Sequence, residues 1–132
     1  MASPSKNPKP NVPYTRTDIQ RMCHGELQTY LPQRKKIILA GCFAIERMNP
    51  DAPEMVYVGN APKVVEKALL LSRQPETVFP VFTKQKRTSK HYYFVGKFRF
   101  KSLSNDPKKI AAAEAVSDRH DELAYVLHLR AA

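Results

Sequence analysis

The sequence predicts an α+β domain built on a small, curved, mixed β-sheet or β-barrel of about five strands, with flanking helices. Apolar and turn-forming residues divide the chain into elements in the order α, β, β, α, β, β, α, β. That order has too few strand–helix–strand units for a doubly wound parallel sheet. A chain of 132 residues suffices for one hydrophobic core of moderate size, so we expect residues 15–132 to form a single domain.

Residues 1–14 are predicted to form a flexible, basic, proline-rich arm. The stretch holds four prolines and two lysines, and it has too few apolar side chains to bury enough surface to become ordered. It is either a linker or a basic arm that touches a backbone phosphate.

The first helix is predicted over residues 18–31. Thr17 is the expected N-cap, with Gln20 completing a capping box, and Pro32 ends the helical pattern. A buried strand is predicted over residues 36–47, where Gly41 indicates a bulge or a close approach of neighbouring atoms.

The middle of the chain predicts a loop over residues 49–53, a short strand over 55–58 and a helix that ends near Arg73. Asn60 is the expected N-cap of this helix, with Pro62 in its first turn. The glycine and asparagine before the helix also suit an anion, but they lack the spacing of a phosphate-binding loop.

The second half of the chain predicts strands over residues 78–85, 91–103 and 123–129. A turn or loop over residues 87–90 joins the first two strands. A short helix is expected to begin near Pro107, with Asp106 as its cap.

The net charge of +10 favours a polyanionic partner. Nucleic acid is the first expectation, followed by an acidic membrane surface or an acidic protein. No apolar run approaches the ~18 residues that span a bilayer, and the N-terminus lacks the apolar region of a signal peptide. Cys23 and Cys42 are too few for a disulfide framework, so we expect reduced thiols in a cytoplasmic protein.

The stretch from Pro80 to Ser102 gathers both positive charge and aromatic side chains. It contains seven Lys or Arg, no Asp or Glu, and six of the twelve aromatic residues. Strand periodicity predicts that its even-numbered aromatics face the core and that its odd-numbered cations form a row on the other face. Such a row suits a phosphate backbone. Lysines on an edge strand also oppose aggregation, and aromatics in strands usually fill cores.

Neither a metal site nor a catalytic site is expected. The Cys and His residues lack the spacing of zinc ligands, and no cofactor-binding motif is present. Asp118, His120 and Asp121 are the residues that a small nuclease site would use, but we expect them to lie in a solvated helix-to-strand connection.

Five segments together resemble the PUA-like superfamily, and within it the SRA-like modified-DNA readers of bacterial restriction systems. They are "TYLP", "GCFAIERMNPDAP", "VYVGNAPKV", "VFPVFTK" and "YYFVGKFRF", and the resemblance covers residues 14–130. It implies a curved β-barrel with a concave pocket. Readers of this kind grip DNA with loops and flip a modified base into an aromatic-walled pocket.

The resemblance also implies roles for individual residues. The pocket walls would be Tyr57, Phe82, Tyr93 and Phe94. Hydrogen bonds to the edge of the base would come from Asn60 and Thr83. Phosphates would be held by Lys84, Lys86, Arg87, Lys90, Lys97 and Arg99.

Two departures from the family pattern bear on these roles. Tyr92 and Tyr93 stand where the family has a tryptophan, and only Asp51 is a candidate to read a cytosine amino group. No nuclease domain is attached in this sequence, so a DNA reader would need a separate nuclease or effector as its partner. An RNA-binding domain of the same fold and a protein-interaction subunit are the alternatives.

Overall fold

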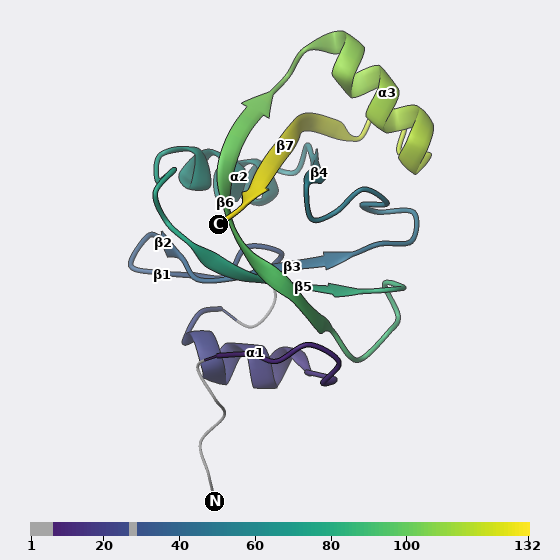
Figure 1. Ribbon diagram of the computed structural model, residues 1–132. Helices are drawn as coiled ribbons and strands as arrows, with labels where there is room; N and C mark the ends of the chain where they lie inside the picture. The colour runs from purple at the N-terminus through teal and green to yellow at the C-terminus, as the bar shows by residue number, and fades with distance from the viewer. Residues whose placement is uncertain (1–6, 27–28) are drawn as a thin grey trace, which may run out of the picture.

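The computed structural model describes residues 7–26 and 29–132, and it confirms the α+β class. In this part of the chain, three helices accompany a five-stranded mixed sheet and a two-stranded sheet. The five strands lie in the order β3-β5-β6-β7-β4, and the long strand β6 bends through the molecule (Figure 1). No closed barrel is found among the described residues, so the mixed sheet is established and the predicted barrel is not confirmed.

Helix α1, Arg16–Cys23, is shorter than the predicted helix and begins at a different cap. The Thr15 hydroxyl accepts a hydrogen bond from the Asp18 N–H, and the Asp18 carboxylate accepts one from the Thr15 N–H. His24 ends the helix in the left-handed conformation. The prediction of Thr17 as the cap and of a helix up to residue 31 was therefore wrong, although residues 27–28 lie outside the described part.

The predicted strand over residues 36–47 is divided into two strands. Strand β1, Gln33–Arg34, pairs with β2, Ile37–Ile38, in a short hairpin. The chain then turns, with the Leu39 N–H bonded to the Pro32 carbonyl, before β3, Gly41–Ala44. The close approach predicted at Gly41 is confirmed, because a Cβ there would lie 2.9 Å from the ring of Phe43.

Strand β4, Met55–Gly59, and helix α2, Pro62–Ser72, match their predicted ranges closely. The cap of α2 does not match, because Ala61 occupies the N-cap position and no side chain caps the helix. Asn60 instead contacts the turn before the last strand, through hydrogen bonds to the Asp121 and Glu122 carbonyls.

Strands β5, Phe79–Lys84, and β6, Tyr93–Ser104, form the predicted hairpin. Their register shifts between Val81 and Phe82, and Gly96 on the partner strand has φ +138°, which together mark a β-bulge. The bulge divides the aromatics of β6 between two clusters. Phe94 packs in the cluster with α1, and Phe98 lies in the main core, so the prediction that they share one face was wrong.

Helix α3, Pro107–Ser117, has the predicted Asp106 cap, and strand β7, Leu123–Ala131, follows it. The outward-facing Val126 of β7 packs with Ala113 of α3. The inward-facing Leu127 belongs to the main core. Helix α3 therefore covers part of the outer face of the sheet (Figure 1).

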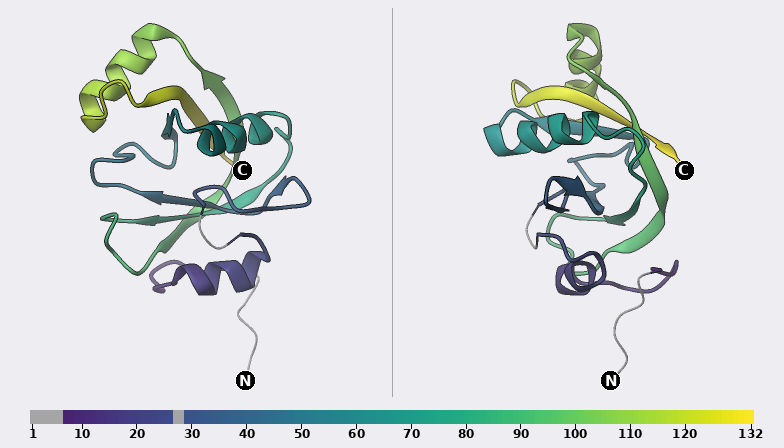
Figure 2. Two further views of the ribbon diagram at one scale, coloured as in Figure 1. Left: turned by 180° about the vertical axis from the view of Figure 1, so that it is seen from behind. Right: turned by 90° about the vertical axis from the view of Figure 1, so that its left-hand side faces the viewer.

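Strands β3 and β5 pair in parallel and lie between two helices, with α1 on one side and α2 on the other (Figures 1 and 2). Cys42 and Phe82 point into the α1 cluster, whereas Phe43 and Val81 point into the main core. Burial on both faces is typical of parallel strands. The ends of β3 and β5 and the start of α1 are therefore close together, and the candidate site lies there. No helix among the described residues is both long and apolar enough to cross a membrane.

Candidate nucleic-acid interface

A pocket of about 450 Å³ lies where α1, the ends of β3 and β5, and the β5–β6 loop converge. Its volume is within the range of small-ligand sites. We call it the hairpin pocket. Its lining residues are Arg16, Thr17, Thr29, Tyr30, Cys42, Ala44, Met48, Lys84, Arg87 and Tyr92.

One side of the hairpin pocket is cationic and is organised around Tyr92. The Lys84 ammonium lies 4.9 Å from the centroid of the Tyr92 ring, and the Arg16 guanidinium carbon lies 5.9 Å from it. Both distances are within the range of cation–π attraction. Tyr92 is only 7% exposed, so it acts as a fixed support for the two cations rather than as an open stacking surface.

Lys84 also connects the pocket to the loop of the hairpin. Its ammonium donates a hydrogen bond of 2.8 Å to the Arg87 carbonyl. Burial, the Arg16 charge and the Arg87 charge together lower the pKa of Lys84. Burial is the largest of these causes, and the two neighbouring positive charges add to it. None of the described residues that line the pocket is an acid. A bound anion would relieve both the burial cost and the repulsion.

The hairpin pocket also has apolar lining residues, Tyr30, Cys42, Ala44 and Met48. Cys42 and Ala44 lie beside the cations, because Ala44 pairs with Lys84 between β3 and β5 and the Cys42 thiol interacts with Arg16. The Tyr30 hydroxyl donates a 2.6 Å hydrogen bond to the Val64 carbonyl, which fixes the position of its ring. Burial raises the pKa of the Cys42 thiol to about 12, so the thiol stays neutral and serves as apolar wall. The pocket thus combines apolar surface with positive charge.

A second and larger cavity, of about 830 Å³, adjoins the hairpin pocket and shares Thr29, Tyr30 and Met48 with it. Two of its cations are already paired. Lys67 forms an ion pair with Glu26, and Arg119 lies 3.7 Å from the Glu122 carboxylate. The hairpin pocket is therefore the better candidate for an anion, although it is the smaller of the two.

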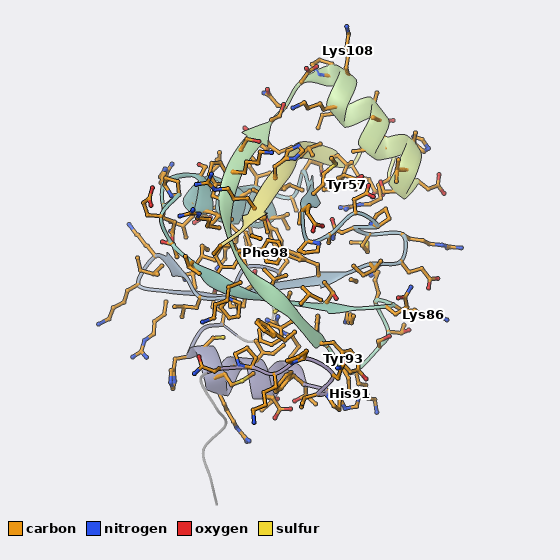
Figure 3. The ribbon with its side chains drawn as sticks, in the orientation of Figure 1. Tyr57, Lys86, His91, Tyr93, Phe98 and Lys108 are labelled. Atoms are coloured by element: carbon orange, nitrogen blue, oxygen red, sulfur yellow. The ribbon has the colours of Figure 1, made fainter. Side chains whose placement is uncertain are left out.

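The predicted phosphate contacts fall into two separate groups. Lys84 and Arg87 line the hairpin pocket. Lys86 and Lys90 are exposed in the adjoining loop, and Lys86 points away from the body of the molecule (Figure 3). Lys97 and Arg99 lie further along β6, outside the pocket.

The four predicted pocket walls are not gathered into one pocket. Phe82 is fully buried, and its ring centroid lies 5.8 Å from that of Phe94 in the cluster that packs against α1. Tyr93 points to solvent with 45% of its surface exposed. Tyr57 lies in β4, near α3 and far from Tyr93 in the sheet order (Figure 3).

The remaining predicted base contacts are also separate from the hairpin pocket. The Tyr57 hydroxyl donates a 2.5 Å hydrogen bond to Asp51, and burial, followed by this carboxylate, raises the pKa of Tyr57 to about 12. Tyr57 and Asn60 line the larger cavity. Thr83 pairs with Tyr93 across the hairpin and is not in the pocket lining.

Sequence reasoning missed Arg16, Tyr30 and Tyr92 as site residues. Tyr92 was assigned to the core, which is correct for its burial but overlooks the cations on its ring. Arg16 is brought to the pocket by the capping box that begins at Thr15. The pattern Thr15-x-x-Asp18 in the sequence was the signal that would have placed it at the start of the helix.

The acidic and histidine cluster before β7 is solvated, as expected. His120 lies 3.2 Å from Asp118, and their side chains are 65% and 90% exposed. In the described ranges, no group of three or more His, Cys, Asp or Glu residues is placed to hold a metal ion. Neither Cys23 nor Cys42 is in a disulfide.

Comparisons with known proteins gave no match: no family model, no curated protein and no solved structure is similar to the chain.

Proposed function

We propose that the protein is a nucleic-acid-binding module, with DNA as the preferred ligand, in which a nucleotide extruded from the duplex enters the hairpin pocket. The observation that carries the proposal is the lining of this pocket, where Arg16, Lys84 and Arg87 converge without a carboxylate among the described lining residues. A nucleotide has an apolar base and an anionic phosphate, and the pocket offers both apolar surface and positive charge.

Several further features support this function. The exposed Lys86 and Lys90 in the loop beside the pocket would contact phosphates that flank the extruded nucleotide. The net charge of +10 would attract the polyanion over a distance. The resemblance to SRA-like readers favours a modified base as the one extruded, a separate nuclease or effector as partner, and a cytoplasmic location.

The pocket differs from the one that the resemblance implied. Tyr30 and Met48 take the place of Tyr57 and Phe82 as the apolar walls, and Tyr92 supports the cations. The base would lie against Tyr30 and Met48, with its phosphate between Lys84 and Arg87. Phe82 and Phe94 would then serve as the packed layer that holds Tyr92 in place.

The test is a double variant, Lys84→Met with Arg87→Gln, measured with duplexes that carry 2-aminopurine beside an unmodified, a cytosine-modified or an adenine-modified target base. The fluorescence of 2-aminopurine rises when its stacking on the neighbouring base is lost, so it reports extrusion of that base. We expect the wild-type protein to raise the signal and the double variant to leave it near the level of free DNA.

The matched control is Arg34→Gln with Arg73→Gln. It removes the same two charges from exposed positions outside the pocket, so extrusion should remain as in the wild type. If both double variants lost the signal equally, the pocket residues would act only through the net charge of the protein. Absence of any signal with the wild type would rule out base extrusion.

A further inference from the structure

The outer face of β6 and β7 is exposed beyond the region that α3 covers. On β7 the inward positions, Leu127 and Leu129, belong to the main core. Val126 points outward and lies under α3. Because side chains alternate along a strand, His128 and Arg130 also point outward. His128 lines a hollow together with residues of α3, and Arg130 is exposed.

This face gathers basic side chains from three elements, β6, β7 and α3. We call it the outer basic face. Its members are Lys97, Arg99, Lys101, Lys109, His128 and Arg130. Arg99 and Arg130 stand directly opposite each other in the antiparallel pair. Like charges in this position destabilise a sheet, so the arrangement has a stability cost that a bound anion would offset.

Two nitrogen atoms on the outer basic face lack hydrogen-bond partners. Within the described residues, Arg99 Nε and His128 Nε2 are the buried side-chain polar atoms for which no partner is found. A buried polar atom without a partner costs free energy. Both atoms belong to residues of the outer basic face, so its two partly buried members, Arg99 and His128, are not fully satisfied by the described residues.

The charge on this face is not neutralised within the described part of the chain. None of the six residues takes part in the ion pairs found there. Burial, Lys109 and Lys101 lower the pKa of His128. Asp51 and Tyr57 line the hollow beside His128 under α3. The Asp51 carboxylate already accepts a hydrogen bond from the Tyr57 hydroxyl.

We propose that the outer basic face is a second phosphate-binding surface, which holds duplex DNA that flanks the nucleotide in the hairpin pocket. This inference rests on the proposed function. No residue is shared between the two surfaces, so each can be removed separately. The strand from Tyr93, which follows Tyr92 of the hairpin pocket, to Lys101 spans at most ~26 Å at ~3.3 Å per residue. A duplex must therefore extend ~8 base pairs beyond the extruded nucleotide to reach the far end of the outer basic face.

The test compares a short duplex of about 8 bp with a long duplex of about 24 bp, by anisotropy over a range of salt concentrations. The target base is central in both, so only ~4 bp of the short duplex lie on each side of it, too few to reach Arg99. The variant is Arg99→Gln with Arg130→Gln, and the control is again Arg34→Gln with Arg73→Gln. On the long duplex we expect the salt slope of the variant to be shallower by about 1.8, or ~0.9 for each phosphate that is no longer neutralised. The short duplex should bind the variant and the wild type with the same slope.

Because Arg99 is half-buried, a second variant guards against loss of fold. Lys97→Gln with Lys101→Gln changes two exposed residues of the same face and should give a similar change of slope. Thermal unfolding of both variants establishes that they are folded.

Three results would overturn the inference. The first is that both variants of the outer basic face bind the long duplex with the same salt slope as the control variant. The second is equal weakening on the short and long duplexes, which would mean that the face is not a separate surface. The third is full competition by polyglutamate at the same charge concentration, which would point to an acidic protein partner. The 2-aminopurine signal is measured independently, so the proposed function can fail or stand separately.

Discussion

At the scale of single residues, the site depends on how one side chain is supported by others. Lys84 lies over the ring of Tyr92 and donates to the Arg87 carbonyl. These two interactions hold its charge at the wall of the pocket while burial lowers its pKa. The hydrophobic pattern of β5 did not indicate where the Lys84 side chain lies, because its position depends on Tyr92, which comes just before the next strand.

His128 provides a prediction for pH dependence. Burial and the charges of Lys109 and Lys101 lower its pKa in the folded protein below the ordinary value of 6.5. Between the lowered pKa and 6.5 the unfolded chain binds more protons than the folded protein, so stability rises with pH in this window and falls as the solution is acidified.

We therefore expect the wild type to lose more free energy of unfolding than His128→Gln when the pH falls from about 7.5 to about 5.5. Urea denaturation at both pH values measures this difference. An equal loss in the two proteins would mean that His128 titrates as it does in the unfolded chain.

At the scale of residues, the sequence predicted which stretch carries the positive charge better than it predicted where each basic residue lies in the fold. The acid-free stretch that contains Lys84, Arg87, Lys97 and Arg99 is visible in the sequence, and the first two of these line the hairpin pocket. Arg16 was not predictable from that stretch, because it comes from the other end of the chain and only the packing of α1 brings it to the site.

At the scale of elements, the bulge in the β5–β6 hairpin determines which aromatics support the site. It sends Phe94 toward α1 and Phe98 toward the main core. Gly96 allows it, because φ +138° is a conformation that residues with a side chain rarely adopt.

Gly96→Ala should lower the free energy of unfolding by about 1–3 kcal/mol, because the added Cβ is strained at this φ. The Cβ would also meet the Phe98 ring at 3.3 Å. Val95→Ala, at an exposed neighbouring position, is the control and should change stability by about 0.5 kcal/mol or less. If denaturant titrations showed the same small loss of unfolding free energy for both variants, the hairpin would tolerate another conformation at Gly96.

Elements with strong local signals were predicted well, and the others were not. Helices α2 and α3 and strands β4, β5 and β7 have a proline start, a periodic apolar face or clear turn residues around them. The strand expected over residues 36–47 failed because an apolar run does not reveal where the chain bends. The bend falls at Leu39, whose N–H donates a hydrogen bond to the Pro32 carbonyl. The expected face of β6 failed because a bulge reverses the alternation of a strand.

At the scale of the whole molecule, two helices that sandwich the parallel pair β3 and β5 place the hairpin pocket at one end of the sheet. The antiparallel strands β6 and β7 carry the outer basic face, away from that pocket. This arrangement would allow one surface to take the extruded nucleotide and the other to hold the flanking duplex. The open order of the sheet leaves β3 and β4 as its edges, and sequence patterning alone does not distinguish such a sheet from a barrel.

The most direct measurement is fluorescence anisotropy with three duplexes of one sequence, unmodified, cytosine-modified and adenine-modified, and with a single-stranded RNA, each at two salt concentrations. The proposed function predicts that one modified duplex binds more tightly than the other ligands and keeps this advantage at the higher salt concentration. Equal binding of all four ligands, abolished together as salt rises, would contradict it, because the positive charge would then act only as a nonspecific electrostatic surface.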